Sequence, residues 1–141
     1  MKASDVLIKK LKEFEGLRTE AYLDAAGVPT IGYGHTGDVS LGDIISEYWA
    51  EYLLRKDLYE TELEVDKLGL AKTQGQFDAL VSFAFNLGIA RLKRSTLLKA
   101  IRQRSNRNAI RREFKKWVYA NGKQLPGLVK RREWEADRFF E

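Results

Sequence analysis

The feature that most constrains the fold is a segment near the middle of the chain, Phe77–Asn86 (FDALVSFAFN), which is apolar on nearly all sides of a helix. A helix of this kind is stable only when other elements surround it. The preceding residues Thr73–Gln76 (TQGQ) form a capping box, in which the Thr73 side chain accepts a hydrogen bond from the Gln76 amide. We therefore expect a buried helix to begin there, at the centre of a helical bundle.

The first residues of the chain predict an amphipathic helix over residues 4–15. Ser4 is a suitable N-cap, and Gly16 supplies a stop at the other end. Apolar side chains recur between them at helical spacing, namely Leu7, Ile8, Leu11 and Phe14. Glu15 is therefore expected to lie at the C-terminal end of a helix.

The helical period disappears after Gly16 and returns near Ile44. The intervening residues are rich in glycine and include TIGYG, which predicts short strands joined by turns. Residues 44–68 resume helical spacing and predict one long amphipathic helix. A turn is expected over 121–127. Further helices are expected at 96–104, 108–118 and 128–139.

Together these elements predict an α+β fold in a single domain over residues 1–141. A small β-containing lobe at about 16–43 is followed by a linking helix at about 44–68. A larger helical lobe at about 69–141 is completed by the N-terminal helix of residues 4–15. A chain of 141 residues is long enough for such a core.

The amino-acid composition excludes disulfide bonds and several kinds of metal site. The chain has no cysteine and one histidine, so disulfide bonds, thiolate metal sites and histidine clusters are excluded, and we expect no metal. The N-terminal residues alternate apolar side chains with lysines and contain no unbroken apolar stretch of about 20 residues. We therefore expect no signal peptide and no stable membrane insertion.

Charge is distributed unevenly along the chain, although the net charge is only +5. Residues 1–90 carry 9 Lys and Arg against 15 Asp and Glu, whereas residues 91–141 carry 16 against 5. A basic half suits a polyanion: nucleic acid, a membrane surface or an anionic wall polymer. A nucleic-acid binder places aromatic side chains among its arginines, and residues 91–116 contain almost none before Phe114. We therefore expect no nucleic-acid partner.

Two acidic residues in the first third of the chain have environments that predict different protonation. The carbonyl groups at a helix C-terminus disfavour a charged carboxylate, so the pKa of Glu15 is expected to rise. Asp24 lies nine residues later in a turn, LDAAG, where a carboxylate stays solvated and charged. Such a pair is the minimal apparatus for cleaving a glycosidic bond. Thr30, six residues further on, can hold a water molecule with its hydroxyl.

Each of these residues also has an ordinary structural explanation. A glutamate at a helix end is commonly an exposed capping or ion-pairing residue, and an aspartate in a turn stabilises that turn. Glycines in a strand usually mark a bulge or a hairpin. The hypothesis of a catalytic site therefore rests on the three residues as a set. The alternatives from other classes are a wall-binding module without catalysis and a basic nucleic-acid-binding protein.

The set gains support from a resemblance that covers nearly the whole chain in order. The segment EGLRTEAYLDAAGVPTIGYGHT resembles the active-site segment of phage-type lysozymes, the T4-lysozyme-like endolysins of glycoside hydrolase family 24. QFDALVSFAFNLG resembles the central helix of that family, and STLL resembles the start of a following helix. KWVYANGKQLPGLVKRRE is similar to the C-terminal segment of the lambdoid-prophage branch.

The resemblance implies a lysozyme-like fold and a muramidase that hydrolyses the β-1,4 bond between N-acetylmuramic acid and N-acetylglucosamine. Its partner would be the glycan strands of bacterial peptidoglycan, and the resemblance implies no cofactor and a monomer. The protein would be made in the host cytoplasm and reach the wall after release, with a holin as the expected route. Glu15 would be the general acid, while Asp24 and Thr30 would position the attacking water.

Further residues are predicted around these three. The resemblance aligns four positions with substrate-binding residues: Thr36, Phe85, Asn86 and Ser95. Some members of the family have a basic residue beside the acid, and among Lys130, Arg131 and Arg132 we favour Arg131 for this role. His35 is expected to support the site through a hydrogen bond to a carboxylate such as Asp57 or Asp66. The tryptophans are expected mainly in the core, with Trp117 nearest to the site.

Overall fold

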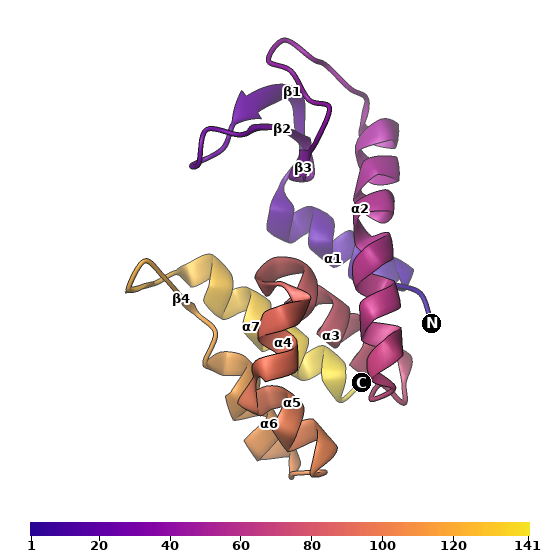
Figure 1. Cartoon of the computed structure of the whole chain (residues 1–141), viewed down its shortest axis with the longest axis vertical. Coiled ribbons are helices and arrows are strands. Elements are labelled where there is room, and N and C mark those ends of the chain that lie inside the picture. The colour runs from indigo at the N-terminus through magenta and orange to yellow at the C-terminus, as the bar shows by residue number, and fades with distance from the viewer. The chain divides into compact units, whose positions relative to one another are not determined.

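The computed structural model describes all residues 1–141, and these form two compact units. The helical unit combines Met1–Leu7 with Glu60–Glu141, and the sheet unit is Ile8–Tyr59. Two helices contribute to both units: α1 (Asp5–Glu15) passes the boundary after Leu7, and α2 (Glu47–Leu68) passes it after Tyr59. Figure 1 shows the course of these elements along the chain.

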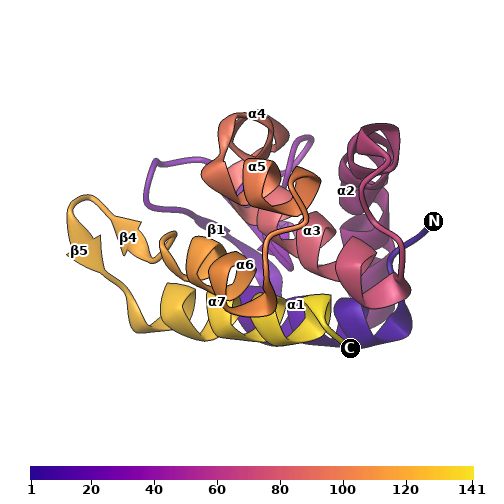
Figure 2. The same cartoon turned by 90° about the horizontal axis from the view of Figure 1, so that it is seen from below.

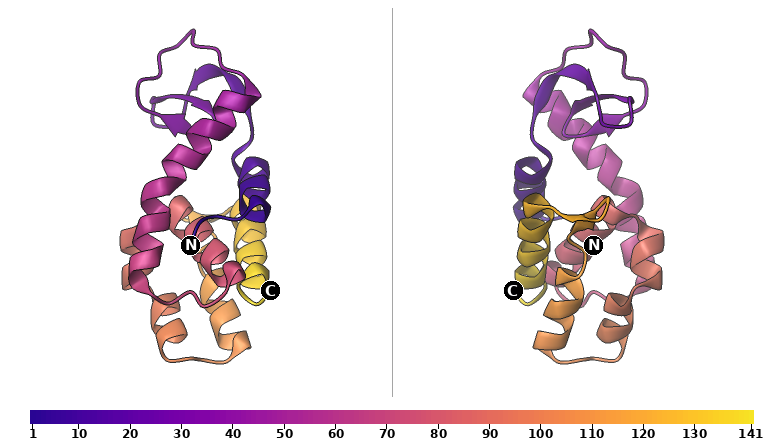
Figure 3. Two further views of the ribbon diagram at one scale, coloured as in Figure 1. Left: turned by 90° about the vertical axis from the view of Figure 1, so that its right-hand side faces the viewer. Right: turned by 90° about the vertical axis from the view of Figure 1, so that its left-hand side faces the viewer.

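The sheet unit contains one antiparallel sheet of three short strands in the order β1-β2-β3, which Figure 3 shows in dark violet. The strands are β1 (Arg18–Leu23), β2 (Pro29–Gly32) and β3 (His35–Thr36). Apolar side chains of α1, β2 and α2 form the core of this unit, because helices and a sheet of this size must bury one face each. The buried residues are Ile8, Leu11, Ile31, Tyr33, Ala50, Leu54 and Leu58.

The long helix α2 begins at Glu47, three residues later than the spacing predicts. Residues 44–46 instead extend along the edge of β1, where Glu20 and Ile44 form an antiparallel bridge and the Ile45 amide donates to the Thr19 carbonyl at 2.9 Å. The Ser46 hydroxyl then accepts from the Trp49 amide at 3.2 Å, as an N-cap does. Pairing with β1 therefore delays the start of the helix.

The helical unit is built around α3 (Gln74–Leu87), which packs against α7 (Pro126–Phe139) and α4 (Ile89–Arg94). Helix α6 (Arg107–Lys115) packs against α7 and against α5 (Thr96–Arg102). Figure 2 shows α6 lying along α7. The α+β arrangement predicted from the sequence is confirmed. None of the helices combines the length and the apolar character needed to span a bilayer.

The prediction of a buried central helix is confirmed by α3. Nine of its residues are buried, and the Thr73 hydroxyl accepts from the Gln76 amide at 3.1 Å. The Gln76 side chain reaches back to the Lys72 amide at 2.8 Å, which completes the cap. Gly75 allows close contact with α7, because a Cβ at this position would lie 2.3 Å from the Arg138 carbonyl oxygen.

The N-terminal residues are attached to the helical unit by hydrogen bonds. The amino group of Met1 donates to Asp66 at 2.9 Å, and the Ser4 amide donates to Asp78 at 3.1 Å. Ser4 also caps α1, since its hydroxyl accepts from the Leu7 amide at 3.2 Å. The predicted N-cap of the first helix is therefore confirmed.

Two small elements were not expected from the sequence. Helix α4 forms between Gly88, whose positive φ of 95° ends α3, and Ser95, which caps α5. A hairpin of β4 (Tyr119–Ala120) and β5 (Lys123–Gln124) occupies part of the expected turn. Its loop is Asn121-Gly122, with φ of 51° and 78°, and Asn-Gly is the dipeptide that favours two-residue hairpins.

Candidate active site

Glu15 is the last residue of α1, as the sequence predicts. The chain leaves the helix through Gly16, whose φ of 73° is the left-handed conformation that glycine adopts without strain. The Gly16 amide donates to the Lys12 carbonyl at 3.0 Å, which closes the last turn. The Glu15 side chain is half-buried at this end of the helix.

The turn between β2 and β3 brings backbone close to the Glu15 carboxyl. Gly34 lies in this turn with a φ of 85°, and a Cβ placed on it would stand 3.6 Å from Glu15 Oε1. Gly32 at the end of β2 allows close packing against α2 and the residues before it. A Cβ on Gly32 would meet the side chains of Ala50 and Ile45 at 3.3 Å.

Asp24 follows β1 directly and organises the loop that leads to β2. Its Oδ1 accepts from the amides of Ala26 and Val28, both at 2.9 Å, and the Asp24 amide donates to the Val28 carbonyl at 3.0 Å. Its Oδ2 makes no hydrogen bond within the protein. The turn-forming role considered for Asp24 is therefore present, and one carboxylate oxygen is left for another partner.

Thr30 lies in β2, opposite Tyr22 of β1 and Thr36 of β3. Its side chain is almost completely buried, at 3% exposure, and its hydroxyl donates to the Val28 carbonyl at 2.8 Å. Donation of the hydroxyl proton leaves the oxygen lone pairs available as acceptors. Glu15, Asp24 and Thr30 all belong to the sheet unit.

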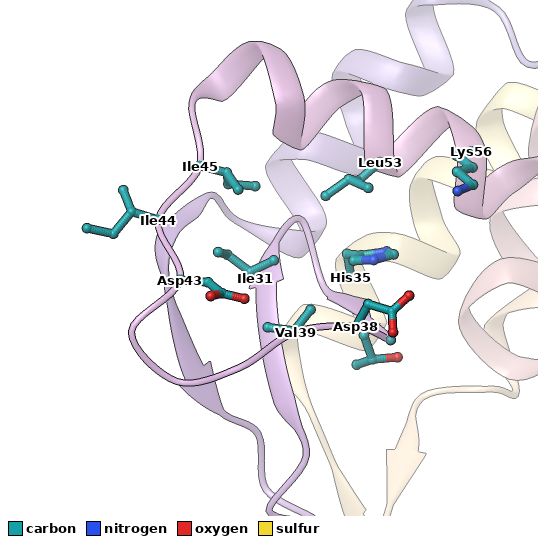
Figure 4. Close-up of a pocket in the computed structure, with 11 residues that line it drawn as sticks. Ile31, His35, Asp38, Val39, Asp43, Ile44, Ile45, Leu53 and Lys56 are labelled. Atoms are coloured by element: carbon teal, nitrogen blue, oxygen red, sulfur yellow. The ribbon is translucent and has the colours of Figure 1, made fainter.

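His35 supports the sheet unit through a carboxylate, as expected. Its Nδ1 lies 2.8 Å from Asp57 Oδ2, on α2. Asp66, the other expected partner, binds the amino group of Met1 instead. His35 and Thr36 also line a pocket of about 450 Å³ beside the loop over residues 37–45, and Figure 4 shows His35 between Asp38 and Lys56. Glu15, Asp24 and Thr30 do not line this pocket.

One ion pair of the sheet unit was missed from the sequence. Lys12 on α1 bonds to Glu51 on α2, which also accepts from Arg55 at 3.1 Å. The hydrogen bond from Lys12 is the main cause that lowers the pKa of Glu51, and the same bond raises the pKa of Lys12. Lys12 also lies 5.8 Å from the centre of the buried Tyr33 ring.

The remaining predicted site residues lie in the helical unit. Phe85 is half-buried and Asn86 is exposed near the end of α3, and the Asn86 side-chain oxygen accepts from Arg132 at 2.9 Å. Ser95 is buried, and its hydroxyl donates to the Leu92 carbonyl and accepts from the Leu98 amide. Its evident role is to cap α5. A substrate-binding role for these residues stays a prediction.

Arg131 belongs to a buried charged cluster on α7. Its Nη2 donates to the Ser82 carbonyl at 3.0 Å, and it lies near Glu135. Arg132 and Glu135 are fully buried and approach to 2.7 Å, and Ser82 donates to Glu135 at 2.5 Å. Burial raises the pKa of Glu135, opposed by both arginines, and burial lowers the pKa of Arg132. The site role expected for Arg131 stays a prediction.

The tryptophans differ from the expectation of a mainly buried set. Trp49 is 53% exposed and makes edge contacts with Tyr48 and Tyr52 on α2. The cause is its place on the outer face of that helix, opposite the buried Ala50 and Leu54. Trp117 is half-buried, with its ring 5.5 Å from that of Phe83 in the helical unit. No group of three metal-ligating side chains comes together in the structure.

Comparison with known proteins identifies one matching family and several similar sequences. The family model described as Phage lysozyme matches residues 12–135. An endolysin of Bacillus phage B103 is 49% identical over 99% of this chain, and the match covers 54% of that relative. An endolysin of Acyrthosiphon pisum secondary endosymbiont phage 1 is 42% identical over 92% of this chain and 91% of its own length. The chain therefore spans about half the length of the first relative and most of the second.

Solved structures are similar over the whole chain. The endolysin from Escherichia coli O157:H7 phage FAHEc1 has a TM-score of 0.87 and 36% identity, covering 100% of this chain and 94% of its own. The muramidase domain of SpmX from Asticaccaulis excentricus has a TM-score of 0.88 and 34% identity, covering 99% of this chain and 98% of its own.

Proposed function

Because the chain belongs to the phage lysozyme family, we propose that it is an endolysin-type muramidase that cleaves the β-1,4 bond between N-acetylmuramic acid and N-acetylglucosamine in peptidoglycan. The lysozyme-like α+β fold expected from the sequence is confirmed by the solved structures. The observation that carries the proposal is the position of Glu15 at the end of α1, beside the Gly34 backbone and in the same unit as Asp24 and Thr30.

Glu15 is the proposed general acid. In the reaction, the proton passes from Glu15 to the glycosidic oxygen as the bond from that oxygen to the anomeric carbon breaks. We place the glycosidic oxygen beside this carboxyl, next to the Gly34 backbone.

Asp24 is the proposed base for the attacking water. The Asp24 loop adjoins the start of β2, whereas Glu15 lies beside the turn that follows the end of β2. A four-residue strand separates its ends by about 10 Å at about 3.3 Å per residue. Carboxyl groups about 6.5–9.5 Å apart are typical of inverting glycosidases, which keep a water between them. The family resemblance implies an inverting reaction, and the separation of the Glu15 and Asp24 carboxyl groups is the test of it.

The water would be held between Asp24 and Thr30. The free Oδ2 of Asp24 takes a proton from the water as its oxygen bonds to the anomeric carbon, and the Thr30 oxygen accepts the other hydrogen. The product then has a new reducing end of inverted configuration, and Glu15 is left charged. Asp24 returns its proton through solvent, which restores the starting state.

The other predicted residues are assigned to substrate binding. Thr36 is paired with Thr30 across the sheet, so we place it beside the reacting sugar. Phe85 offers apolar contact and Asn86 a polar one, with Arg132 fixing the orientation of the Asn86 side chain. Arg131 is proposed as a supporting basic residue of the site. The Ser95 hydroxyl makes two bonds within its own helix, so its contribution is to hold the start of α5 in place.

The proposed setting is that of a phage lysis protein. We propose that the chain acts as a monomer, without cofactor and without nucleic acid, on the wall of the cell in which it was made. Release through a holin remains the proposed route. Several relatives are named SAR-endolysins, for example that of bacteriophage PS119, which is 39% identical over 87% of this chain.

The test replaces the acid by its neutral analogue. Glu15→Gln keeps the size of the side chain and is expected to lower lysis of chloroform-permeabilised Gram-negative cells by at least about 100-fold, because a general acid contributes about 10²–10⁴-fold. Turbidity loss measures the rate, and the identity of new reducing ends separates a muramidase from a glucosaminidase or an amidase.

The matched control is Glu13→Gln, an exposed acid of the same helix that pairs with Lys10. It makes the same change from carboxyl to amide and is expected to keep the activity of the unmodified protein. Circular dichroism should show that both variants fold. Full activity of the Glu15 variant would mean that the acid is assigned wrongly.

A further inference from the structure

The helical unit contains a second pocket, of about 420 Å³, that the proposed reaction does not use. It lies between the α2–α3 connection, the end of α5 and the end of α7. Its polar lining consists of Lys72, Arg102, Arg104 and Gln76, and no acidic residue lines it. Its apolar lining includes Ile101, Ile110, Phe139 and Phe140.

The arginines of this pocket have no partner inside the protein. Arg102 and Arg104 are exposed and form neither an ion pair nor a side-chain hydrogen bond. Arg138 of the neighbouring α7 differs from these arginines, because it forms an ion pair with Asp78 at 2.8 Å. Lys72 reaches only the Gly69 carbonyl, at 3.4 Å. Three cationic side chains therefore line one cavity that has no acidic residue in its lining, so an anion bound there would be attracted from several sides.

Two further features make the electrostatic potential at this pocket more positive. The first turn of α3 contributes Gln76 to the lining, and the N-terminal end of a helix carries partial positive charge. Arg107 and Arg111 lie against the Phe140 ring, at 4.9 and 5.5 Å from its centre. Arg111 is neutralised by Asp137, whereas Arg107 forms no ion pair. The rim of the pocket thus has a net positive charge.

The chemistry of the pocket favours a polar anion over a lipid. The Phe140 ring is in contact with two guanidinium groups, so it is not an open surface for an acyl chain. Ile110 and Phe114 of α6 are buried, which leaves this basic helix without an exposed apolar face for a membrane. Arginine forks are suited to the oxygens of phosphate groups. Exposed basic residues continue beyond the pocket, at Lys99, Arg107, Arg112 and Lys115, and match a ligand with repeated charges.

We propose that the pocket lined by Lys72, Arg102 and Arg104 binds a phosphate group of a phosphodiester polymer of the bacterial wall, and that this holds the protein on the wall. The site lies in the helical unit, apart from the three residues proposed for catalysis in the sheet unit. Binding therefore does not require hydrolysis, and a Glu15→Gln protein is expected to bind as the unmodified protein does.

The experiment measures binding of poly(glycerol phosphate) by isothermal titration calorimetry. The double variant Arg102→Gln/Arg104→Gln is expected to bind at least about tenfold more weakly, because charge-assisted hydrogen bonds to phosphate are lost. The matched control is Arg91→Gln/Arg94→Gln, two exposed arginines near the end of another short helix that form no ion pair. It removes the same charge and is expected to change affinity less than about threefold.

Three further probes distinguish the ligand. Polyglutamate of equal charge and vesicles of phosphatidylglycerol are expected to bind more weakly than poly(glycerol phosphate), and inorganic phosphate is expected to compete at high concentration. An equal loss of affinity in the two double variants would show that binding depends only on general surface charge. That result would overturn the proposal. Tighter binding of polyglutamate or of the vesicles would also overturn it. Unfolding curves and a lysine version, Arg102→Lys/Arg104→Lys, show whether lost binding reflects a lost fold.

Discussion

At the scale of single residues, Asp24 has a structural role that is separable from the chemical role proposed for it. Its Oδ1 holds the amides of Ala26 and Val28, which shapes the loop before β2. Its Oδ2 is the oxygen available to a water molecule. A substitution that keeps an oxygen but removes the charge therefore divides the two roles.

Asp24→Asn retains an amide oxygen for the two loop amides, so its free energy of unfolding is expected to change by less than about 1 kcal/mol. Its lysis rate is expected to fall by at least about 100-fold, since an amide cannot act as a base. Asp24→Ala loses both roles and is expected to lose about 1–2 kcal/mol of stability as well. Denaturant unfolding and turbidity assays check these values. Full activity of Asp24→Asn would mean that Asp24 stabilises the turn and has no part in the reaction.

Local pattern accounts for some site residues and not for others. Glu15 at a helix end follows from Gly16, and the Asp24 turn follows from LDAAG, because both depend on residues a few positions away. The contact of Gly32 with Ala50 depends on how β2 and α2 pack. The bond between Asn86 and Arg132 joins two helices in the same way. Such tertiary contacts produce no periodic pattern in a single sequence, so they could not be predicted from it.

At the scale of elements, the packing of α3 against α7 depends on one glycine. A Cβ at Gly75 would lie 2.3 Å from the Arg138 carbonyl oxygen and 2.8 Å from that of Glu141, and both are backbone atoms. Fraying the end of α7 would relieve the clash only by giving up the ion pair between Arg138 and Asp78. The two helices are therefore expected to lose stability when this position gains a side chain.

Gly75→Ala is expected to lower the free energy of unfolding by about 1–3 kcal/mol, the usual range for overpacking. Gly127→Ala is the matched control, because Gly127 lies in the first turn of α7 with no atom within 4 Å of an added Cβ. It is expected to be neutral or to stabilise the protein by up to about 1 kcal/mol. Thermal unfolding followed by circular dichroism compares them. Equal stabilisation by both changes would contradict the close approach of α3 and α7.

Element boundaries also show where sequence patterns stop being informative. Helix α3 was predictable because capping and burial agree on one segment. The start of α2 was displaced to Glu47 because the edge of β1 competes for residues 44–46, and apolar spacing does not register that competition. The Asn121-Gly122 hairpin was readable in principle, since this dipeptide is a known hairpin signal.

At the scale of the whole molecule, charge is divided between the two units. The sheet unit carries 6 Lys and Arg against 9 Asp and Glu, whereas the helical unit carries 19 against 11. The three residues proposed for catalysis therefore belong to the acidic unit, and the basic unit is suited to attract an anionic wall.

This division predicts that binding to intact walls depends on ionic strength. Raising salt from 0.01 to 0.15 M shortens the screening length from about 30 to about 8 Å, so long-range attraction of the basic unit is largely removed. The Glu15→Gln protein, which leaves walls undigested, is expected to sediment with intact walls severalfold less at the higher salt. On walls stripped of anionic polymers, the same change in salt is expected to alter binding by less than about twofold. An equal salt response on both kinds of wall would show that the attraction is to the peptidoglycan itself.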